Sequence, residues 1–198
     1  MPTTLPVGFR VLGIDAGFAA PGWSVVQVGN EGFEVKKAGA IITTGTSAKE
    51  RKKGKIYKSE DDARRIEEIA GTFRELLCEF DPHIVAIELP TSGAKSAAAI
   101  KGMAYAAACV VSVMKAMDFK VYYLTPRANK LTATADRLAS KQAMVDAISR
   151  QFPNFPWPLK TTGMKKNRGK LDEVPGYAMA DATSAALTYL AEVVNKPE

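Results

Sequence analysis

Three acidic residues in this sequence stand in surroundings that are otherwise apolar or built from small residues. Asp15 ends the run VLGI, Glu88 ends the run IVAI, and Asp181 lies within YAMADATSAAL. A buried carboxylate is costly unless a cation or hydrogen bonds compensate its charge. Neighbouring carboxylates repel unless a cation lies between them, and Mg²⁺ prefers oxygen ligands. The three acids together predict a site for one or two divalent cations, which suits in-line phosphoryl transfer.

Each acid also has an ordinary structural explanation. Asp15 could be a turn residue, Glu88 could favour the start of a helix, and Asp181 could pair with a lysine. The metal interpretation is favoured because the acids come from three distant segments, and two of them end apolar runs.

The elements that must position these acids alternate between strands and helices. We expect strands at 9–14, 23–28, 33–44, 84–87 and 120–124, and helices at 60–80, 94–117, 141–151 and 177–194. Short connections predict an antiparallel meander for the first three strands, and strands separated by helices should be parallel. The order predicts a single α/β domain over residues 1–198, with helices on both faces of a mixed sheet.

The positions of the acids follow from this arrangement. If the first and fourth strands are parallel neighbours, Asp15 and Glu88 lie side by side at the edge where α/β sheets bind ligands. The alanines around Asp181 would let its helix approach the sheet closely and bring the third acid to the same edge.

Two basic segments, at about residues 46–59 and 152–176, are expected to be loops. The whole chain has a net charge of +6, which together with these segments favours a polyanionic partner. Phosphate contacts from such loops would supply affinity without sequence information, although a charge run is often only a solvated segment. The candidate DNA-binding residues are Arg51, Lys52, Lys53 and Lys55 in the first segment and Lys160, Lys165, Lys166, Arg168 and Lys170 in the second.

The apolar segments predict neither secretion nor membrane insertion. The longest apolar stretch, 103–117, contains Lys115 and is too short to cross a bilayer. The first residues lack the pattern of a secretory signal. We therefore expect a cytoplasmic protein.

Several segments, in their order along the chain, resemble the RuvC-type Holliday junction resolvases of the RNase H-like (retroviral integrase) superfamily. The segments are VLGIDAG, IVAIELP, YYLTPRANK, KQAMVDAI and MADATSAAL. The resemblance implies an RNase H-like fold with a five-stranded mixed sheet and a homodimer. It also implies cleavage of four-way DNA junctions that depends on two Mg²⁺ ions, with Mn²⁺ as a substitute.

The resemblance also assigns roles to individual residues. It makes Asp15, Glu88 and Asp181 catalytic metal ligands. It places Lys130 and Lys141 near the active site and the DNA backbone, and Lys141 could also orient water or a phosphate during catalysis.

Three departures from the family pattern suggest a divergent, phage-like branch with a broader substrate range. Ala178 stands one helical turn before Asp181, where the family has a fourth metal ligand, so three carboxylates suffice or Asp172 or Glu173 substitutes. Residues 89–93 contain no aromatic residue that could wedge into a junction. Both basic segments are also larger than expected of the bacterial core.

Three other functions remain as alternatives. One is a nuclease acting mainly on forks, flaps or RNA–DNA hybrids, and another is a junction-binding protein without catalysis. A third takes GIDAG as the phosphate-binding turn of an actin-like ATPase; that fold needs two such domains and usually far more than 198 residues, so the length argues against it.

Overall fold

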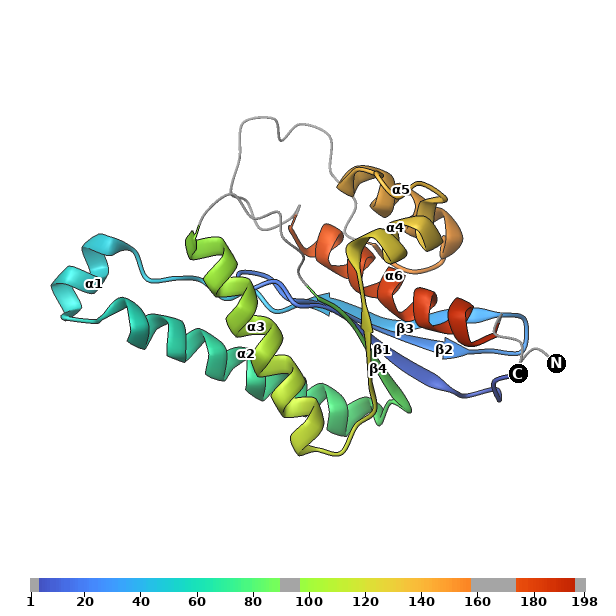
Figure 1. Cartoon of the computed structure of the whole chain (residues 1–198), viewed down its shortest axis with the longest axis horizontal. Coiled ribbons are helices and arrows are strands. Elements are labelled where there is room, and N and C mark those ends of the chain that lie inside the picture. The colour runs from blue at the N-terminus through green and yellow to red at the C-terminus, as the bar shows by residue number, and fades with distance from the viewer. Residues whose placement is uncertain (1–3, 90–96, 158–173, 195–198) are drawn as a thin grey trace.

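The computed structural model describes residues 4–89, 97–157 and 174–194. A central sheet lies between two layers of helices (Figure 1). Its strands are β1 (Arg10–Asp15), β2 (Gly22–Val28), β3 (Phe33–Ala40), β4 (Ile84–Glu88) and β5 (Val121–Leu124). The helices of the described residues are α1 (Ala48–Gly54), α2 (Lys58–Phe80), α3 (Ala97–Ala116), α4 (Pro126–Thr134), α5 (Lys141–Gln151) and α6 (Val174–Val194).

The five strands form one mixed sheet in the order β3-β2-β1-β4-β5. β1 pairs antiparallel with β2 and parallel with β4. β2 pairs antiparallel with β3, and β4 pairs parallel with β5. The predicted meander, the parallel pairing and the five-stranded mixed sheet are therefore confirmed.

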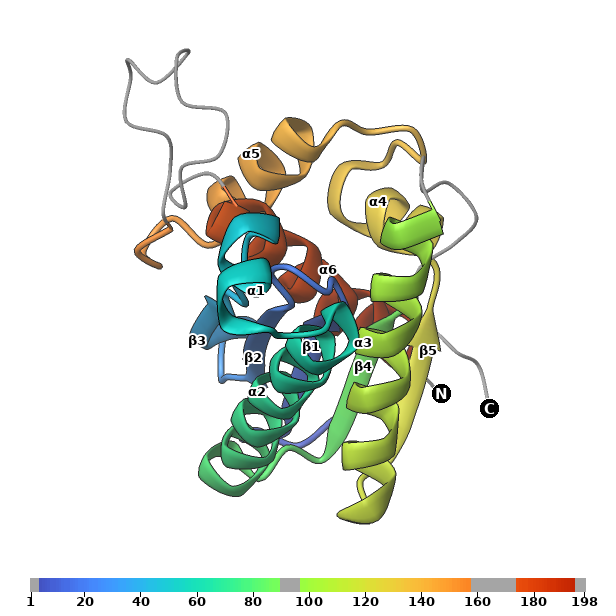
Figure 2. The same cartoon turned by 90° about the vertical axis from the view of Figure 1, so that its left-hand side faces the viewer.

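The two faces of the sheet carry separate hydrophobic cores. Successive side chains of β1 point to opposite faces, so Leu12 and Ile14 pack with α2 and α3, whereas Val11 packs with α5 and α6. Figures 1 and 2 show α2 and α3 on one side of the sheet and α4, α5 and α6 on the other. The expectation of helices on both faces is correct.

The third strand is shorter than predicted. It ends at Ala40, because the backbone N–H groups of Ile41 and Thr43 donate to the carbonyl oxygens of Pro21 and Ala19 at 2.9 and 3.0 Å. This part of the chain pairs with the turn after β1 instead of with β2.

The segment 46–59, predicted to be a loop, contains helix α1 and the start of α2. Ser47 and Glu50 form a capping box at the start of α1, and Lys55 ends the helix in the left-handed conformation (φ 53°). None of the residues of α1 is buried. Its formation therefore reflects capping rather than an apolar face.

Two further helical boundaries differ from the prediction. Helix α4 was not predicted, although Thr125 caps its start and Pro126 occupies its first turn. Helix α6 begins at Val174, inside the segment expected to be a loop.

Helix α6 lies unusually close to the sheet. A Cβ atom on Gly13 would be 1.9 Å from the carbonyl oxygen of Ala182, and one on Gly22 would be 2.0 Å from that of Ala178. Glycines on the strands and alanines on the helix therefore allow backbone contact between them. This close approach, expected from the alanine-rich sequence, carries Asp181 to the edge of the sheet.

Candidate active site

Asp15 and Glu88 are the last residues of two adjacent parallel strands. Their Cα atoms are partners in the β1–β4 register, and the other neighbour of Asp15 is Gly22 at the start of β2. Asp181 reaches the same edge from α6, and its charge raises the pKa of both Asp15 and Glu88. The structure therefore brings the three predicted acids into one electrostatic cluster.

Burial and mutual repulsion disfavour the charged forms of these acids. Burial, with a further contribution from Asp181, raises the pKa of Asp15 to about 7. Burial and the charges of Asp15 and Asp181 raise the pKa of Glu88 to about 8. Burial also raises the pKa of Asp181. A cation bound between these acids would therefore strongly stabilise their ionised forms.

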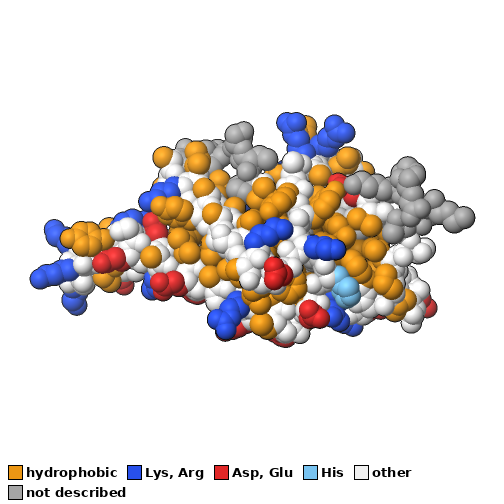
Figure 3. All heavy atoms as spheres, turned by 60° about the horizontal axis from the view of Figure 1, so that its bottom comes forward, with side chains coloured by type: hydrophobic (Ala, Val, Ile, Leu, Met, Phe, Trp, Pro, Cys, Tyr) orange, Lys and Arg blue, Asp and Glu red, His pale blue; other side chains and the backbone are white. Residues whose placement is uncertain are grey.

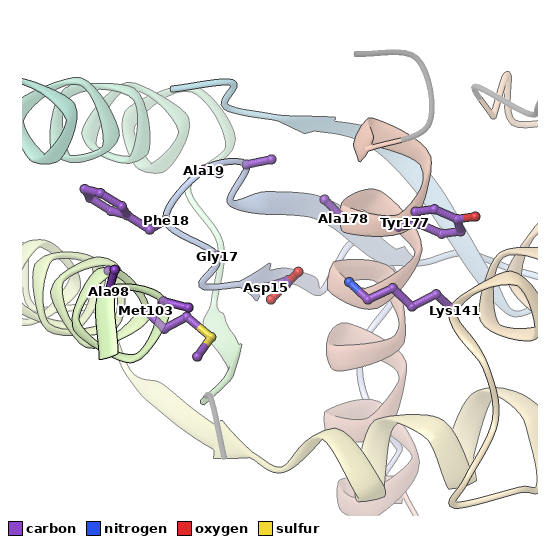
Figure 4. Close-up of a pocket in the computed structure, with 12 residues that line it drawn as sticks. Asp15, Gly17, Phe18, Ala19, Ala98, Met103, Lys141, Tyr177 and Ala178 are labelled. Atoms are coloured by element: carbon purple, nitrogen blue, oxygen red, sulfur yellow. The ribbon is translucent and has the colours of Figure 1, made fainter. Parts of the chain in front are cut away.

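Lys141 supplies part of that positive charge. It is the first residue of α5, after the capping residue Ser140, and Figure 4 shows its side chain directed toward Asp15. Its charge lowers the pKa of all three acids, whereas Lys130 on α4 lowers that of Asp181 alone. Both lysines therefore lie near the acids.

The donor set fits a hard divalent cation. Three carboxylates offer the oxygen ligands that Mg²⁺ and Mn²⁺ accept, and their repulsion falls when a cation lies between them. Among the described residues, no three acidic, histidine or cysteine side chains already converge as a formed metal site. The assignment rests on the strand register, the shared electrostatics and the chemistry of the donors.

A cavity of about 400 Å³ adjoins Asp15 (Figure 4). Its walls are largely apolar and include Phe18 from the turn after β1 and Met103 from α3. Lys141 and Ala178 also line it. Asp15 and Lys141 are therefore accessible from this recess.

Among the described residues, no candidate provides the fourth metal ligand that the family pattern includes. Ala178 is buried in the wall beside Asp15 and has no side-chain donor. Asp172 and Glu173 lie outside the described residues.

The basic candidates fall into three groups. Arg51 uses its guanidinium to donate to the carbonyl oxygen of Thr46. Lys52, Lys53 and Lys55 are exposed on or directly after α1, which stands apart from the helices around the acids (Figure 1). The candidates of the second basic segment, Lys160, Lys165, Lys166, Arg168 and Lys170, lie outside the described residues.

The sequence interpretation missed one residue that contacts the acidic cluster. Asn129, on α4, is fully buried and donates from Nδ2 to Oε2 of Glu88 at 2.5 Å. The capping threonine and the proline that begin α4 could have predicted the helix. No local pattern marks the contact, because the two residues are far apart in the chain.

The chain is similar to known proteins over most of its length. It is 24% identical over 186 residues to crossover junction endodeoxyribonuclease RuvC of Chlorobium phaeobacteroides, a match covering 94% of this chain and 83% of the relative. It is 28% identical over 143 residues to the protein of the same name from a strain of Prochlorococcus marinus, covering 70% of this chain and 79% of the relative.

Two solved structures have a similar fold. Thermus thermophilus RuvC in complex with a Holliday junction substrate matches with a TM-score of 0.63 and 21% identity, covering 92% of this chain and 93% of that one. The yeast mitochondrial Holliday junction resolvase Ydc2 matches with a TM-score of 0.59 and 13% identity, covering 95% of this chain and 80% of that one. At such identities these likenesses establish the fold.

The strongest assignment comes from a family model described as crossover junction endodeoxyribonuclease RuvC. It matches residues 11–155, which include Asp15, Glu88, Lys130 and Lys141. Because this match spans well over half of the sequence and the fold agrees with it, the chain belongs to the RuvC family of crossover junction endodeoxyribonucleases.

Proposed function

We propose that this protein is a metal-dependent endonuclease that cuts Holliday junctions and other branched DNA. Membership of the RuvC family supports the reaction class. The observation that carries the assignment is the register that pairs Asp15 with Glu88 at the ends of two parallel strands. Asp181, whose charge acts on both, would add a third carboxylate to the donor set for Mg²⁺.

Asp15, Glu88 and Asp181 would hold two Mg²⁺ ions, and Mn²⁺ could replace Mg²⁺. When bound, the cation would activate water for attack on the phosphodiester and stabilise the leaving oxygen. Lys141 already offsets the charge of these acids, and its ammonium can also hold a phosphate oxygen beside them.

Basic residues away from the acids would contact the DNA backbone. Lys130 on α4 lies near enough to lower the pKa of Asp181, and the exposed lysines of α1 extend the basic surface away from the cluster. Such contacts add affinity without reading sequence, which suits an enzyme that recognises the shape of a junction. The candidate DNA-binding residues between positions 160 and 170 also belong to this proposal.

We further propose that α3 forms the interface of a homodimer. In this helix only Gly102, Ala106, Val110 and Met114 are buried among the described residues. The large side chains of Ile100 and Tyr105 are 55% and 37% exposed. Figure 3 shows broad hydrophobic areas on the face that carries α2 and α3. An exposed apolar surface of this kind is typical of an interaction site.

A second copy explains this surface better than a bilayer. By length and composition, α3 could cross a membrane, which differs from the sequence prediction that no apolar stretch is long enough. However, α3 packs against α2 and β5 in the folded domain. Small residues such as Ala104 and Ala108 on its exposed side allow two helices to approach closely. A two-fold dimer would present two active sites to the two cut strands of a symmetric junction.

The proposed activity can be tested with a labelled synthetic four-way junction. Wild-type protein should cut it in Mg²⁺, and Asp15→Asn should reduce the rate by at least about a thousand-fold because a metal ligand is lost. Equal cleavage by both proteins would refute the assignment. Tight, metal-independent binding without product would instead establish a junction-binding protein.

The same assay can define the substrate range. Forks, flaps and RNA–DNA hybrids should be compared with the junction at equal concentration, and we expect branched DNA to be cut faster than the hybrid. We place this activity in the cytoplasm of a bacterial or phage-infected cell.

A further inference from the structure

Asn129 is a fully buried polar residue next to one of the proposed metal ligands. Its Nδ2 donates to Oε2 of Glu88 at 2.5 Å. When Glu88 is ionised, as a metal ligand must be, a hydrogen bond to its carboxylate is stronger than one between neutral groups. The bond therefore restrains the orientation of the Glu88 side chain.

Asn129 is itself held from a second element. Ser184, which is fully buried on α6, donates from Oγ to the backbone carbonyl oxygen of Asn129 at 2.8 Å. Ser184 lies three positions after Asp181, about one helical turn away. A buried polar path thus runs from α6, which carries one acid of the cluster, through α4 to β4, which carries another.

Folding alone does not account for an asparagine at this position. Its Oδ1 atom is buried and has no hydrogen-bond partner among the described residues. A buried acceptor without a donor is destabilising, whereas an apolar side chain of similar size would avoid that cost. What the amide provides at this position is the N–H donor to Glu88.

We propose that Asn129 is a positioning residue that holds Glu88 in the orientation in which it binds the metal. The inference rests on the proposed role of Glu88 as a metal ligand. Asn129 acts through Glu88 and does not itself touch the substrate. Ser184 in turn fixes the α4 backbone at Asn129 relative to the α6 helix that carries Asp181.

The test measures Mn²⁺ binding by isothermal titration calorimetry, without DNA, and thermal unfolding of the same samples. Asn129→Leu keeps the branched shape and the number of side-chain heavy atoms but removes the N–H donor. We expect its Mn²⁺ affinity to fall about ten-fold or more, while its melting temperature stays equal to that of the wild type or rises. Asn129→Ala should weaken binding similarly, and it carries the test if the leucine does not fit.

A variant at Thr188 is the matched control. Thr188 is buried on α6, like Ser184, but its hydroxyl donates to the carbonyl oxygen of Ser184 within the helix. Thr188→Val should therefore lower stability without changing Mn²⁺ affinity. Ser184→Ala should weaken Mn²⁺ binding by a smaller factor than Asn129→Leu.

A double-mutant cycle separates action through Glu88 from a general effect. In a Glu88→Gln background, Asn129→Leu should cause no further loss of Mn²⁺ affinity. An unchanged affinity in the single Asn129→Leu variant, or an equal loss in both backgrounds, would overturn the inference. If Glu88→Gln itself binds Mn²⁺ as the wild type does, the proposed metal site fails instead.

Discussion

Asp15 and Glu88 are direct partners across the parallel β1–β4 ladder, and each is the last residue of its strand. Because both side chains emerge where the two strands end, neither can move far from the other without disrupting the sheet. The fold thus holds two carboxylates together despite their repulsion, and α6 adds a third.

In the absence of divalent cations, the protein should lose stability as the pH rises. The pKa values of Asp15 and Glu88 are raised from 3.8 and 4.5 to about 7 and about 8. Between about pH 4 and pH 8 the folded state therefore binds more protons than the unfolded state, and stability falls with increasing pH. Thermal unfolding in EDTA should show this decline, and added Mg²⁺ should reverse it at pH 8.

Glu88→Gln should remove much of this pH dependence, because the amide carries no charge. At pH 8 in EDTA, its melting temperature should exceed that of the wild type by at least about 2–4 °C, the shift that about 1 kcal/mol causes in a domain of this size. At pH 5 the two proteins should unfold at nearly the same temperature. A variant less stable than the wild type at pH 8 would contradict the proposed repulsion.

Lys141→Gln should shift the pH dependence of cleavage to higher pH. The ammonium of Lys141 lowers the pKa of each of the three acids, so its loss makes them harder to ionise. Rates measured from pH 6 to pH 9 at saturating junction should reveal the shift, with a lower maximum because the proposed phosphate contact of Lys141 is lost. Lys120→Gln, at an exposed lysine just before β5, is the control and should leave the profile unchanged.

Gly13→Ala should destabilise the fold and abolish cleavage together. The added methyl group would lie 1.9 Å from the carbonyl oxygen of Ala182, so α6 must move away from β1 and carry Asp181 with it. We expect a loss of about 3 kcal/mol or more, at or above the upper end for overpacked cores. Denaturant unfolding measures the loss.

The matched control for this substitution is Gly71→Ala on α2. A Cβ atom at Gly71 would have no neighbour within 4 Å, and the residue is exposed. Alanine should therefore stabilise the helix by about 0.5–1 kcal/mol without affecting cleavage. Similar stabilities for the Gly13→Ala variant and the wild type would show that α6 does not depend on this contact.

Ala104→Glu should convert the proposed dimer to a monomer. Ala104 is exposed on α3, and two charges brought into the helix–helix contact would be costly to desolvate. Light scattering after size exclusion should give a dimer for the wild type and a monomer for the variant. Arg74→Glu, at an exposed position on α2, should remain dimeric. A monomeric wild type would refute the interface, and recovery only in membranes or detergent would favour the bilayer.

Local sequence features determined most of the element order and the identity of the acids. Apolar, β-branched runs define β1, β2, β4 and β5, and the three-and-four spacing of apolar residues defines α2. Helices α1 and α4 escaped prediction because their signals lie in the caps rather than in an apolar face. The placement of acids at strand ends was sufficient to predict their convergence once the parallel pairing was assumed.

The sequence alone determined that Asp15, Glu88 and Asp181 would stand at the ends or on the small-residue faces of buried elements. Only the tertiary structure decided how they are supported, because the supporting contacts join distant segments. The bond from Asn129 to Glu88 spans 41 residues, and the backbone contact of Gly13 with Ala182 needs the finished sheet. The exposure of α3 was likewise undecided, since an apolar helix has the same composition whether it faces a core or a partner.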